Sequence, residues 1–243
     1  MISTFSHEYR VKHNETDFWG RLTAPAFGDC MLDIAGLHAM EIGSGIDILQ
    51  RQGLTWVISG MKLRFIDMPK LHGRFRMETH VSAFSRITTQ RDFVAYDGDR
   101  KIAEASSEWL IINMETRRPV FVDEILPQLE EVCIPDGALP KYKHLRAFDG
   151  EVSIEMERKI TYSDLDVNRH LYSMRYLQIA LDTFDLDFFA KHRFTDIDLN
   201  FISEVLCGEV VTVIRRTNGD VHNIEMLRDG KAVFRSEFVT AEA

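Results

Sequence analysis

Two stretches of the chain, Val11-Lys-His-Asn-Glu-Thr-Asp-Phe-Trp-Gly-Arg-Leu22 and Ile160-Thr-Tyr-Ser-Asp-Leu-Asp-Val-Asn-Arg-His-Leu171, decide the fold because they repeat one pattern. Both keep two acids separated by one residue and followed, five positions after the second acid, by leucine. Each stretch precedes apolar residues with helical spacing. These residues are Phe27, Cys30, Met31, Ile34 and His38 in the first half and Leu177, Ala180, Leu181 and Phe184 in the second. The sequence therefore predicts one helix after each copy.

The residues after each predicted helix favour β-strands joined by tight turns. Leu63–Gly73 aligns with Leu199–Gly208 when one residue of slippage is allowed. Asp97-Gly98 and Asp229-Gly230 then occupy matching places, and both are hairpin-type turns. The pattern predicts an α+β fold in which each half is one long helix wrapped by an antiparallel β-sheet.

Length and composition fit two small domains. The chain has 243 residues, of which 45% are hydrophobic and 28% charged, as in ordinary globular proteins. Prolines and glycines gather between the halves. We therefore predict an N-terminal domain over 1–124, a linker over 125–150 and a C-terminal domain over 151–243.

Charge and cysteine content exclude several classes of function. The formal net charge of −9 argues against general nucleic-acid binding. Three widely spaced cysteines favour neither a disulfide framework nor a zinc site, and Asp164–Arg175 fails as a calcium loop because arginines replace its glycine and its glutamate. Without a signal segment or a membrane span, we expect a cytoplasmic protein that needs no metal and no organic cofactor.

The second half carries polar, titratable residues that the first half lacks. Asn168 and His170 stand where the first half has Trp19 and Arg21, and Glu204 stands where it has Met68. The scaffold itself does not require these groups, since the first copy does without them. The asymmetry predicts one active site per chain, in the second half.

The segment Asp164-Leu-Asp-Val-Asn-Arg-His170 resembles the D-x-N-x-H motif of the acyl-acyl carrier protein (acyl-ACP) thioesterases, a double hotdog family. The resemblance extends over most of the chain, through Trp56–Leu63, Tyr176 with Leu181-Asp-Thr183, and Glu204. It implies two tandem hotdog domains, the first binding the acyl chain and the second catalytic. It also implies hydrolysis of fatty acyl-ACP, with acyl carrier protein bearing a fatty acyl-phosphopantetheine as partner. A homodimer is left open.

This chain departs from the family pattern at two places. The family motif often continues His-Val-Asn-Asn, whereas this chain reads His170-Leu-Tyr-Ser173. The family glutamate is commonly followed by cysteine, whereas Val205 follows here and Cys207 comes two residues later. The second departure disfavours a cysteine nucleophile.

The four candidate catalytic residues, Asp166, Asn168, His170 and Glu204, suit thioester hydrolysis. Glu204 or Asp166 can activate water, with Asn168 holding the carboxylate or the water, and His170 can polarise water or protonate the leaving thiolate. In extended backbone the three motif residues would face one side. Each also has a structural alternative: a helix or turn cap for Asp166, a left-handed loop position for Asn168, a core histidine, and a surface ion pair for Glu204.

Three rival functions remain open at this point: an acyl-CoA thioesterase of the same fold, a hotdog dehydratase, and a non-catalytic acyl-binding protein. Two basic groups are candidate docking patches for an acidic carrier. They are Lys62, Arg64, Lys70, Arg74 and Arg76, and Lys141, Lys143 and Arg146.

Overall fold

The chain forms two compact units, Met1–Lys141 and Tyr142–Ala243. In this computed structural model, the described residues are 2–135 and 142–242. No helix among them is both long and apolar enough to cross a membrane. The predicted partner residue Lys141 lies outside the described residues.

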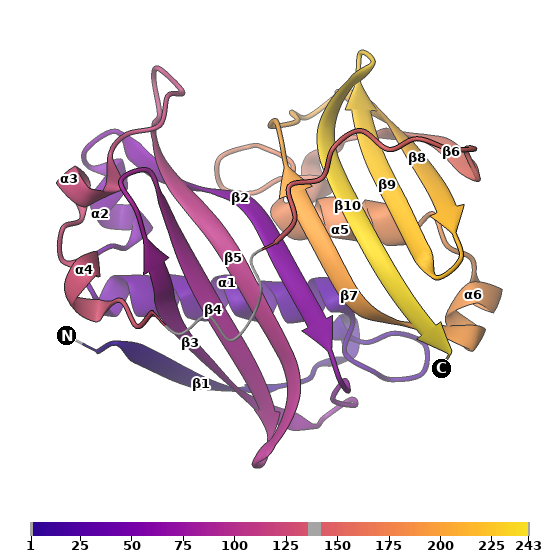
Figure 1. Ribbon diagram of the computed structural model, residues 1–243, viewed down its shortest axis with the longest axis horizontal. Helices are drawn as coiled ribbons and strands as arrows, with labels where there is room; N and C mark the ends of the chain where they lie inside the picture. Colours follow the sequence, from indigo (N-terminus) through magenta and orange to yellow (C-terminus); the bar gives the residue numbers. More distant parts are fainter. Residues whose placement is uncertain (1, 136–141, 243) are drawn as a thin grey trace. The chain divides into compact units, whose positions relative to one another are not determined.

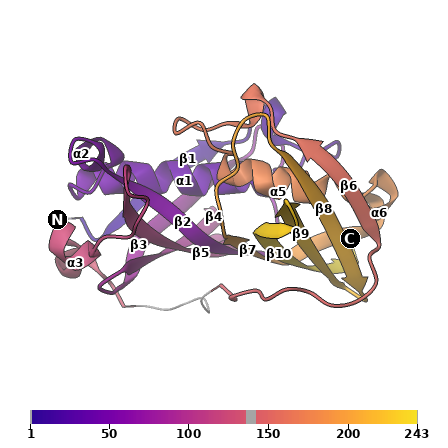
Figure 2. The same ribbon diagram turned by 90° about the horizontal axis from the view of Figure 1, so that it is seen from above.

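The first unit is an antiparallel sheet with helices on one face and at one end (Figures 1 and 2). Its strands have the order β1-β3-β4-β5-β2. Their bounds are β1 Thr4–Arg10, β2 Leu54–Phe65, β3 Arg74–Phe84, β4 Thr88–Asp97 and β5 Arg100–Asn113. The helices are the 3₁₀ turn η1 His13–Glu15 and the α-helices α1 Ala24–Glu41, α2 Ile46–Gln50, α3 Val122–Ile125 and α4 Leu129–Val132.

The second unit repeats this order of strands. Its sheet runs β6-β8-β9-β10-β7, so β6 corresponds to β1 and β7 to β2. The strand bounds are β6 Ile154–Lys159, β7 His192–Phe201, β8 Val210–Asn218, β9 Val221–Arg228 and β10 Lys231–Glu242. The helices are η2 Tyr162–Asp164, α5 Ser173–Leu181 and α6 Leu186–Lys191.

Helix α1 confirms the spacing predicted for the first half. Thr23 begins it, with its hydroxyl accepting from the Ala26 N–H at 3.3 Å, and Gly43 follows its end with φ +69°. The predicted apolar stripe is buried on the sheet, where the Phe27 ring lies 5.4 Å from Phe65 and 6.5 Å from Phe75. Burial of such rings supplies most of the attachment of helix to sheet.

The helix of the second half is shorter than predicted. α5 ends at Leu181, where the Thr183 hydroxyl donates to the Ala180 carbonyl at 2.7 Å. Asp185 then begins α6 by accepting from the Phe188 N–H, so Phe184 lies in the connection between the two helices. Tyr176 fixes α5 on its sheet through ring contacts with Phe201 and Phe234.

The described ends of the predicted linker are packed. Leu126, Leu129 and Val132 are buried in an apolar cluster of the first unit. On the other side, the backbone N–H of Lys143 donates to Asp198 and that of Leu145 to Asn200, both on β7. Residues at both described ends of the predicted linker 125–150 therefore pack against the unit beside them.

The two predicted hairpin turns are confirmed, but the slippage between the halves is wrong. His72 N–H donates to the Val11 carbonyl and Gly208 N–H to the Ile160 carbonyl, so His72 corresponds to Gly208 without an insertion. Both residues have positive φ, +66° and +87°. The first half places a histidine where the second uses the more permissive glycine.

Candidate active site

The candidate motif forms a tight turn. One carboxylate oxygen of Asp166 accepts from the backbone N–H of Asn168 at 2.8 Å and of His170 at 3.0 Å. The Asp166 N–H donates in turn to the His170 carbonyl, and Arg169 has φ +66°. The expectation that residues 166, 168 and 170 face one side of an extended segment is therefore wrong. The carboxylate folds back on its own backbone because it satisfies two amide donors there.

His170 and Glu204 are brought together by a second loop. Backbone pairing between His170 and Leu206, and a bond from Leu171 N–H to the Val205 carbonyl at 2.8 Å, hold this loop against the turn. The His170 Nδ1 lies 3.4 Å from the Glu204 Oε1, with side chains 21% and 39% exposed. An imidazole and a carboxylate thus meet at a partly exposed position.

Arg228, which the sequence reasoning did not single out, anchors the loop of Glu204. Its guanidinium donates to the Glu204 carbonyl and to the Glu209 carboxylate, both at 2.8 Å. The Tyr176 hydroxyl adds a bond to the Ser203 carbonyl. The repeat contained a signal for this residue, because the second half has Arg228 before Asp229-Gly230 where the first half has Tyr96 before Asp97-Gly98.

Comparison with the matching turn of the first unit shows which residues of the motif shape the turn and which occur in the second unit alone. There Asp17 accepts from the N–H groups of Trp19 and Arg21 at 2.9 and 2.8 Å, as Asp166 does from 168 and 170. Its second oxygen accepts from the Arg21 guanidinium at 2.9 Å. The aspartate therefore shapes the turn in both units, whereas the His170–Glu204 pair has no counterpart.

The first turns of α1 and α5 differ in whether a side chain caps them. α1 has the Thr23 hydroxyl on its first turn, whereas at the corresponding place Tyr172 gives α5 no side-chain cap. The first amides of an uncapped helix remain donors for an anionic oxygen, assisted by the helix dipole.

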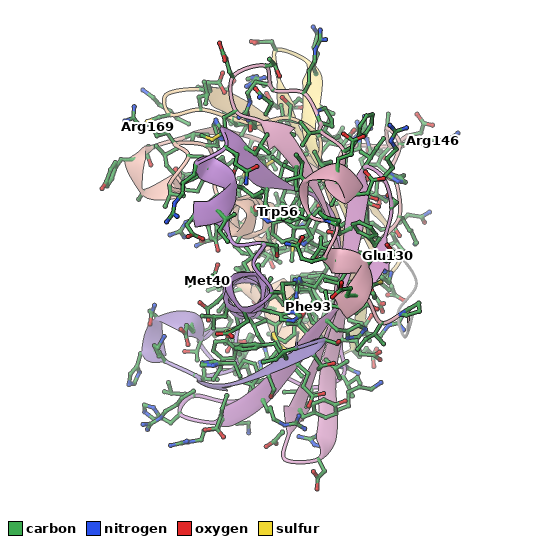
Figure 3. The ribbon with its side chains drawn as sticks, turned by 90° about the vertical axis from the view of Figure 1, so that its left-hand side faces the viewer. Met40, Trp56, Phe93, Glu130, Arg146 and Arg169 are labelled. Atoms are coloured by element: carbon green, nitrogen blue, oxygen red, sulfur yellow. The ribbon has the colours of Figure 1, made fainter. Side chains whose placement is uncertain are left out.

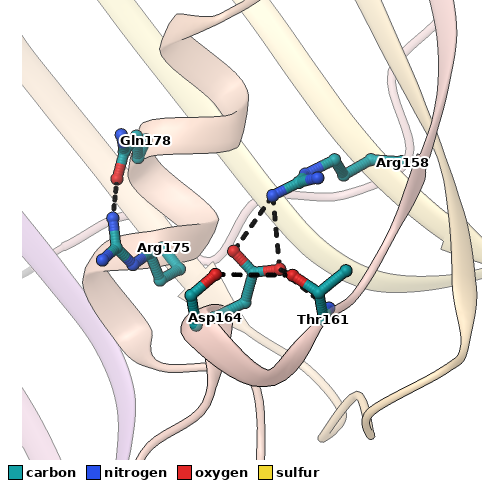
Figure 4. Close-up of polar contacts among 6 residues, drawn as sticks. Arg158, Thr161, Asp164, Arg175 and Gln178 are labelled. Carbon is teal, nitrogen blue, oxygen red and sulfur yellow. Dashed lines mark hydrogen bonds and ion pairs between the residues drawn. The ribbon is translucent and has the colours of Figure 1, made fainter.

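The Asp164 carboxylate holds the residues just before this turn through contacts with Arg158 and Thr161 (Figure 4). Its carboxylate accepts from the N–H and the hydroxyl of Thr161 at 2.8 and 2.9 Å and pairs with Arg158 at 3.0 Å. Burial alone would raise the pKa of Asp164, but the hydrogen bonds from Thr161 and the charges of Arg158 and Arg175 outweigh it. The net pKa lies below the ordinary value.

We expect Asp164→Asn to lower the free energy of unfolding by about 1–2 kcal/mol at pH 7, because it weakens charge-assisted hydrogen bonds. A lowered pKa stabilises the folded state above the unfolded pKa of about 3.9, and this contribution is lost as pH falls through the folded value. Urea unfolding at pH 7, 5 and 3 should show the difference between wild type and variant shrinking with acid. A constant difference would contradict this assignment.

No cysteine stands at the position that often carries the family's thiol. Val205, at the position that often carries the family's thiol, is fully buried, while Cys207 is exposed and Cys30 is buried. We expect Cys207→Ser to keep most of the activity, and mass spectrometry during turnover to detect no acylated protein. An acyl group trapped on Cys207 would instead establish a covalent route.

A separate groove of about 350 Å³ lies in the first unit and contains none of the predicted site residues. It runs between β1 and α1, and its walls include Tyr9, Asp29 and Asp33. Among residues 2–135 and 142–242, no group of three or more histidine, cysteine, aspartate or glutamate side chains could hold a metal ion.

Comparison with known families matches both halves. The model described as the acyl-ACP thioesterase N-terminal domain matches residues 3–129, and that of the C-terminal domain matches residues 149–234. The chloroplastic oleoyl-acyl carrier protein thioesterase of Coriandrum sativum is 24% identical over 229 residues, covering 86% of this chain. This chain spans 61% of that relative's length.

Solved structures match over nearly the whole chain. An acyl-ACP thioesterase from Bacteroides thetaiotaomicron is 26% identical, with a TM-score of 0.90 and 98% of both chains covered. The 12:0-ACP thioesterase from Umbellularia californica is 18% identical, also with a TM-score of 0.90, covering 99% of this chain and 98% of its own; at that identity it supports the fold alone.

Proposed function

The chain belongs to the acyl-ACP thioesterase family, and on that premise we propose that it hydrolyses fatty acyl-ACP to free fatty acid and carrier protein. The observation that carries the proposal is the His170–Glu204 pair at 3.4 Å. It occurs in the unit whose turn carries the family motif and is absent from the equivalent turn of the other unit. This activity would end fatty-acid elongation.

We further propose that the two units are tandem hotdog domains with divided roles. Support comes from their common strand order and from the matching bonds at Asp17 and Asp166. The first, predicted over 1–124, would bind the acyl chain, and the second, predicted over 151–243, would be catalytic.

Hydrolysis then needs three proton movements. Glu204 takes a proton from water as the water oxygen attacks the thioester carbonyl carbon, and a tetrahedral intermediate forms. Protonated His170 gives its proton to the sulfur as the carbon–sulfur bond breaks. The proton on Glu204 passes to His170 across their contact, which restores the starting pair. Asn168 would position the water.

The negative charge on the oxygen of the tetrahedral intermediate needs hydrogen-bond donors, and the uncapped first turn of α5 supplies backbone N–H groups. The backbone amides after Tyr172 begin three residues after His170 and lie at the positive end of the helix dipole. Asp166 serves mainly to hold the turn that presents His170, since its carboxylate accepts two of the turn's amides.

The test is release of free acid from thioesters of one acyl chain on acyl carrier protein and on CoA. We expect kcat/KM to be higher for the carrier protein, and a ratio at or below one would favour the acyl-CoA thioesterase. Elimination of water from a 3-hydroxyacyl thioester would identify a dehydratase. Acyl binding without release, unaffected by loss of His170 and Glu204, would identify a binding protein.

A further inference from the structure

We propose that the surface around the catalytic turn is the docking surface for an acidic carrier domain. We call it the turn surface: Arg169 and Arg175, with the exposed apolar side chains of Tyr162, Val167 and Leu206. The proposal rests on the function above and deepens it by placing the partner. Two observations support it: the backbone conformation of Arg169, and the hydrogen bonds that already occupy the carboxylates of Asp164 and Asp166.

Four of the basic side chains expected from the sequence are buried or already paired. Lys62 is only 5% exposed. Arg74 pairs with Glu8 at 2.6 Å, and Arg76 pairs with Glu78. In the second unit, Lys143 pairs with Glu237 at 2.5 Å. Because a paired or buried cation attracts a distant acidic partner weakly, these four side chains are poor docking sites, and the exposed Lys70 and Arg146 are left as the basic residues of the two groups that could contribute.

Arg169 is held in a conformation that its own backbone disfavours. Its φ of +66° lies in the left-handed region, and the equivalent residue of the first unit is Gly20 with φ +73°. Glycine adopts this conformation without steric cost, whereas arginine does not. The turn would therefore form more easily with glycine at 169, and the arginine is best explained by what its side chain does.

The side chain of Arg169 is exposed and lies on an outer loop of the second unit (Figure 3). It forms no ion pair with any described residue. Arg175 donates a hydrogen bond to the neutral amide of Gln178 (Figure 4), and its positive charge also acts on the Asp164 carboxylate.

The carboxylates of the same turn point inward. Asp164 is 5% exposed and is occupied by Thr161 and Arg158, while Asp166 accepts bonds from the turn's own backbone. The outward-facing charge of the turn is therefore positive, on a chain of net charge −9. This local sign complements an acidic partner and would accelerate its encounter.

Large apolar side chains share this surface. Tyr162 is 89% exposed, Val167 86% and Leu206 47%. Exposed apolar groups next to arginines are typical of protein interfaces, where arginine and tyrosine are enriched. The surface also adjoins the site, because Arg169 precedes His170 and Leu206 pairs with it through the backbone. A carrier bound here would deliver its acylated arm to the His170–Glu204 pair.

The experiment compares Arg169→Glu with wild type on one acyl chain attached to carrier protein, to CoA and to uncharged N-acetylcysteamine. We expect KM for the acyl-carrier protein to rise about tenfold at low salt, with kcat little changed. The rise should shrink at high salt as charges are screened. KM for the N-acetylcysteamine thioester should be unchanged.

Two further variants exclude structural explanations. Arg193→Glu makes the same charge reversal on an exposed arginine at the other end of β7, roughly 30 Å along the strand, and should leave KM unchanged. Arg169→Gly should raise KM while keeping the melting temperature at or above that of wild type, because glycine relieves the positive φ.

The outcomes separate docking from function. Equal increases in KM for the carrier-protein and CoA thioesters would assign Arg169 to the phosphate of the shared arm and overturn carrier docking, as would no increase at all. If wild type hydrolyses no acyl-carrier protein, the proposed function fails. Docking is then measured as the affinity of the protein for unacylated holo-carrier protein. Arg169→Glu must weaken this affinity, and Arg193→Glu must leave it unchanged.

Discussion

Replacing Glu204 by glutamine should lower kcat by about 10²-fold or more, the usual scale for a positioned acid–base group. Glutamine preserves the shape of the side chain but cannot take a proton from water. The loop is held by Arg228 through the Glu204 backbone carbonyl, which the substitution leaves in place. We therefore expect the melting temperature to stay near that of wild type.

The matched control for this experiment is Glu157→Gln, on an exposed carboxylate of β6 in the same unit. It should leave kcat unchanged. His170→Ala should reduce kcat to a similar extent as Glu204→Gln, and the double variant should lose little more, since the two groups act as one unit. Near wild-type turnover by both single variants would place the site elsewhere.

Replacing Asp166 by alanine should reduce both stability and turnover. The carboxylate satisfies two backbone amides of the turn, and we expect its loss to cost about 1–2 kcal/mol of unfolding free energy. Because the same turn presents His170, kcat should also fall by about 10²-fold through misplacement of the imidazole. Urea unfolding and steady-state kinetics on one preparation measure both effects.

The repeat supplies the control for this prediction. Asp17→Ala removes the equivalent cap in the first unit and should lower stability by a similar amount while leaving kcat unchanged. Asp166→Asn keeps an oxygen acceptor for the turn and should retain most of the turnover. If Asp166→Asn lowers kcat as much as Asp166→Ala does, the negative charge itself takes part in the reaction and Asp166 is the base.

The sequence predicted the fold because periodic patterns report burial directly. The spacing of Phe27, Met31 and Ile34 gave α1, and the Asp-Gly pairs gave two hairpins. The repeated acids gave the correspondence between the two halves, and the bonds from the turn amides to Asp17 and to Asp166 match it.

Other features depend on contacts that no pattern carries. The end of α5 is set by the Thr183 hydroxyl and the Asp185 cap, two local bonds that compete with continued helix. Arg228 lies 24 residues from the carbonyl that it holds. The repeat shows that the two halves differ at this position, but the hydrogen bond appears only when β9 is placed beside the loop. The direction of the Asp166 carboxylate also required the turn, since spacing alone suggested an extended strand.

The matching turns at Asp17 and Asp166 have a consequence for symmetry. A dimer of identical single-domain chains would present two equivalent reaction centres, and every substitution would appear in both. Here the two copies share one polypeptide, and the second carries Asn168, His170 and Glu204 where the first has Trp19, Arg21 and Met68. The proposed site therefore gives each polypeptide one reaction centre, and the other turn is free to diverge as long as Asp17 keeps its shape.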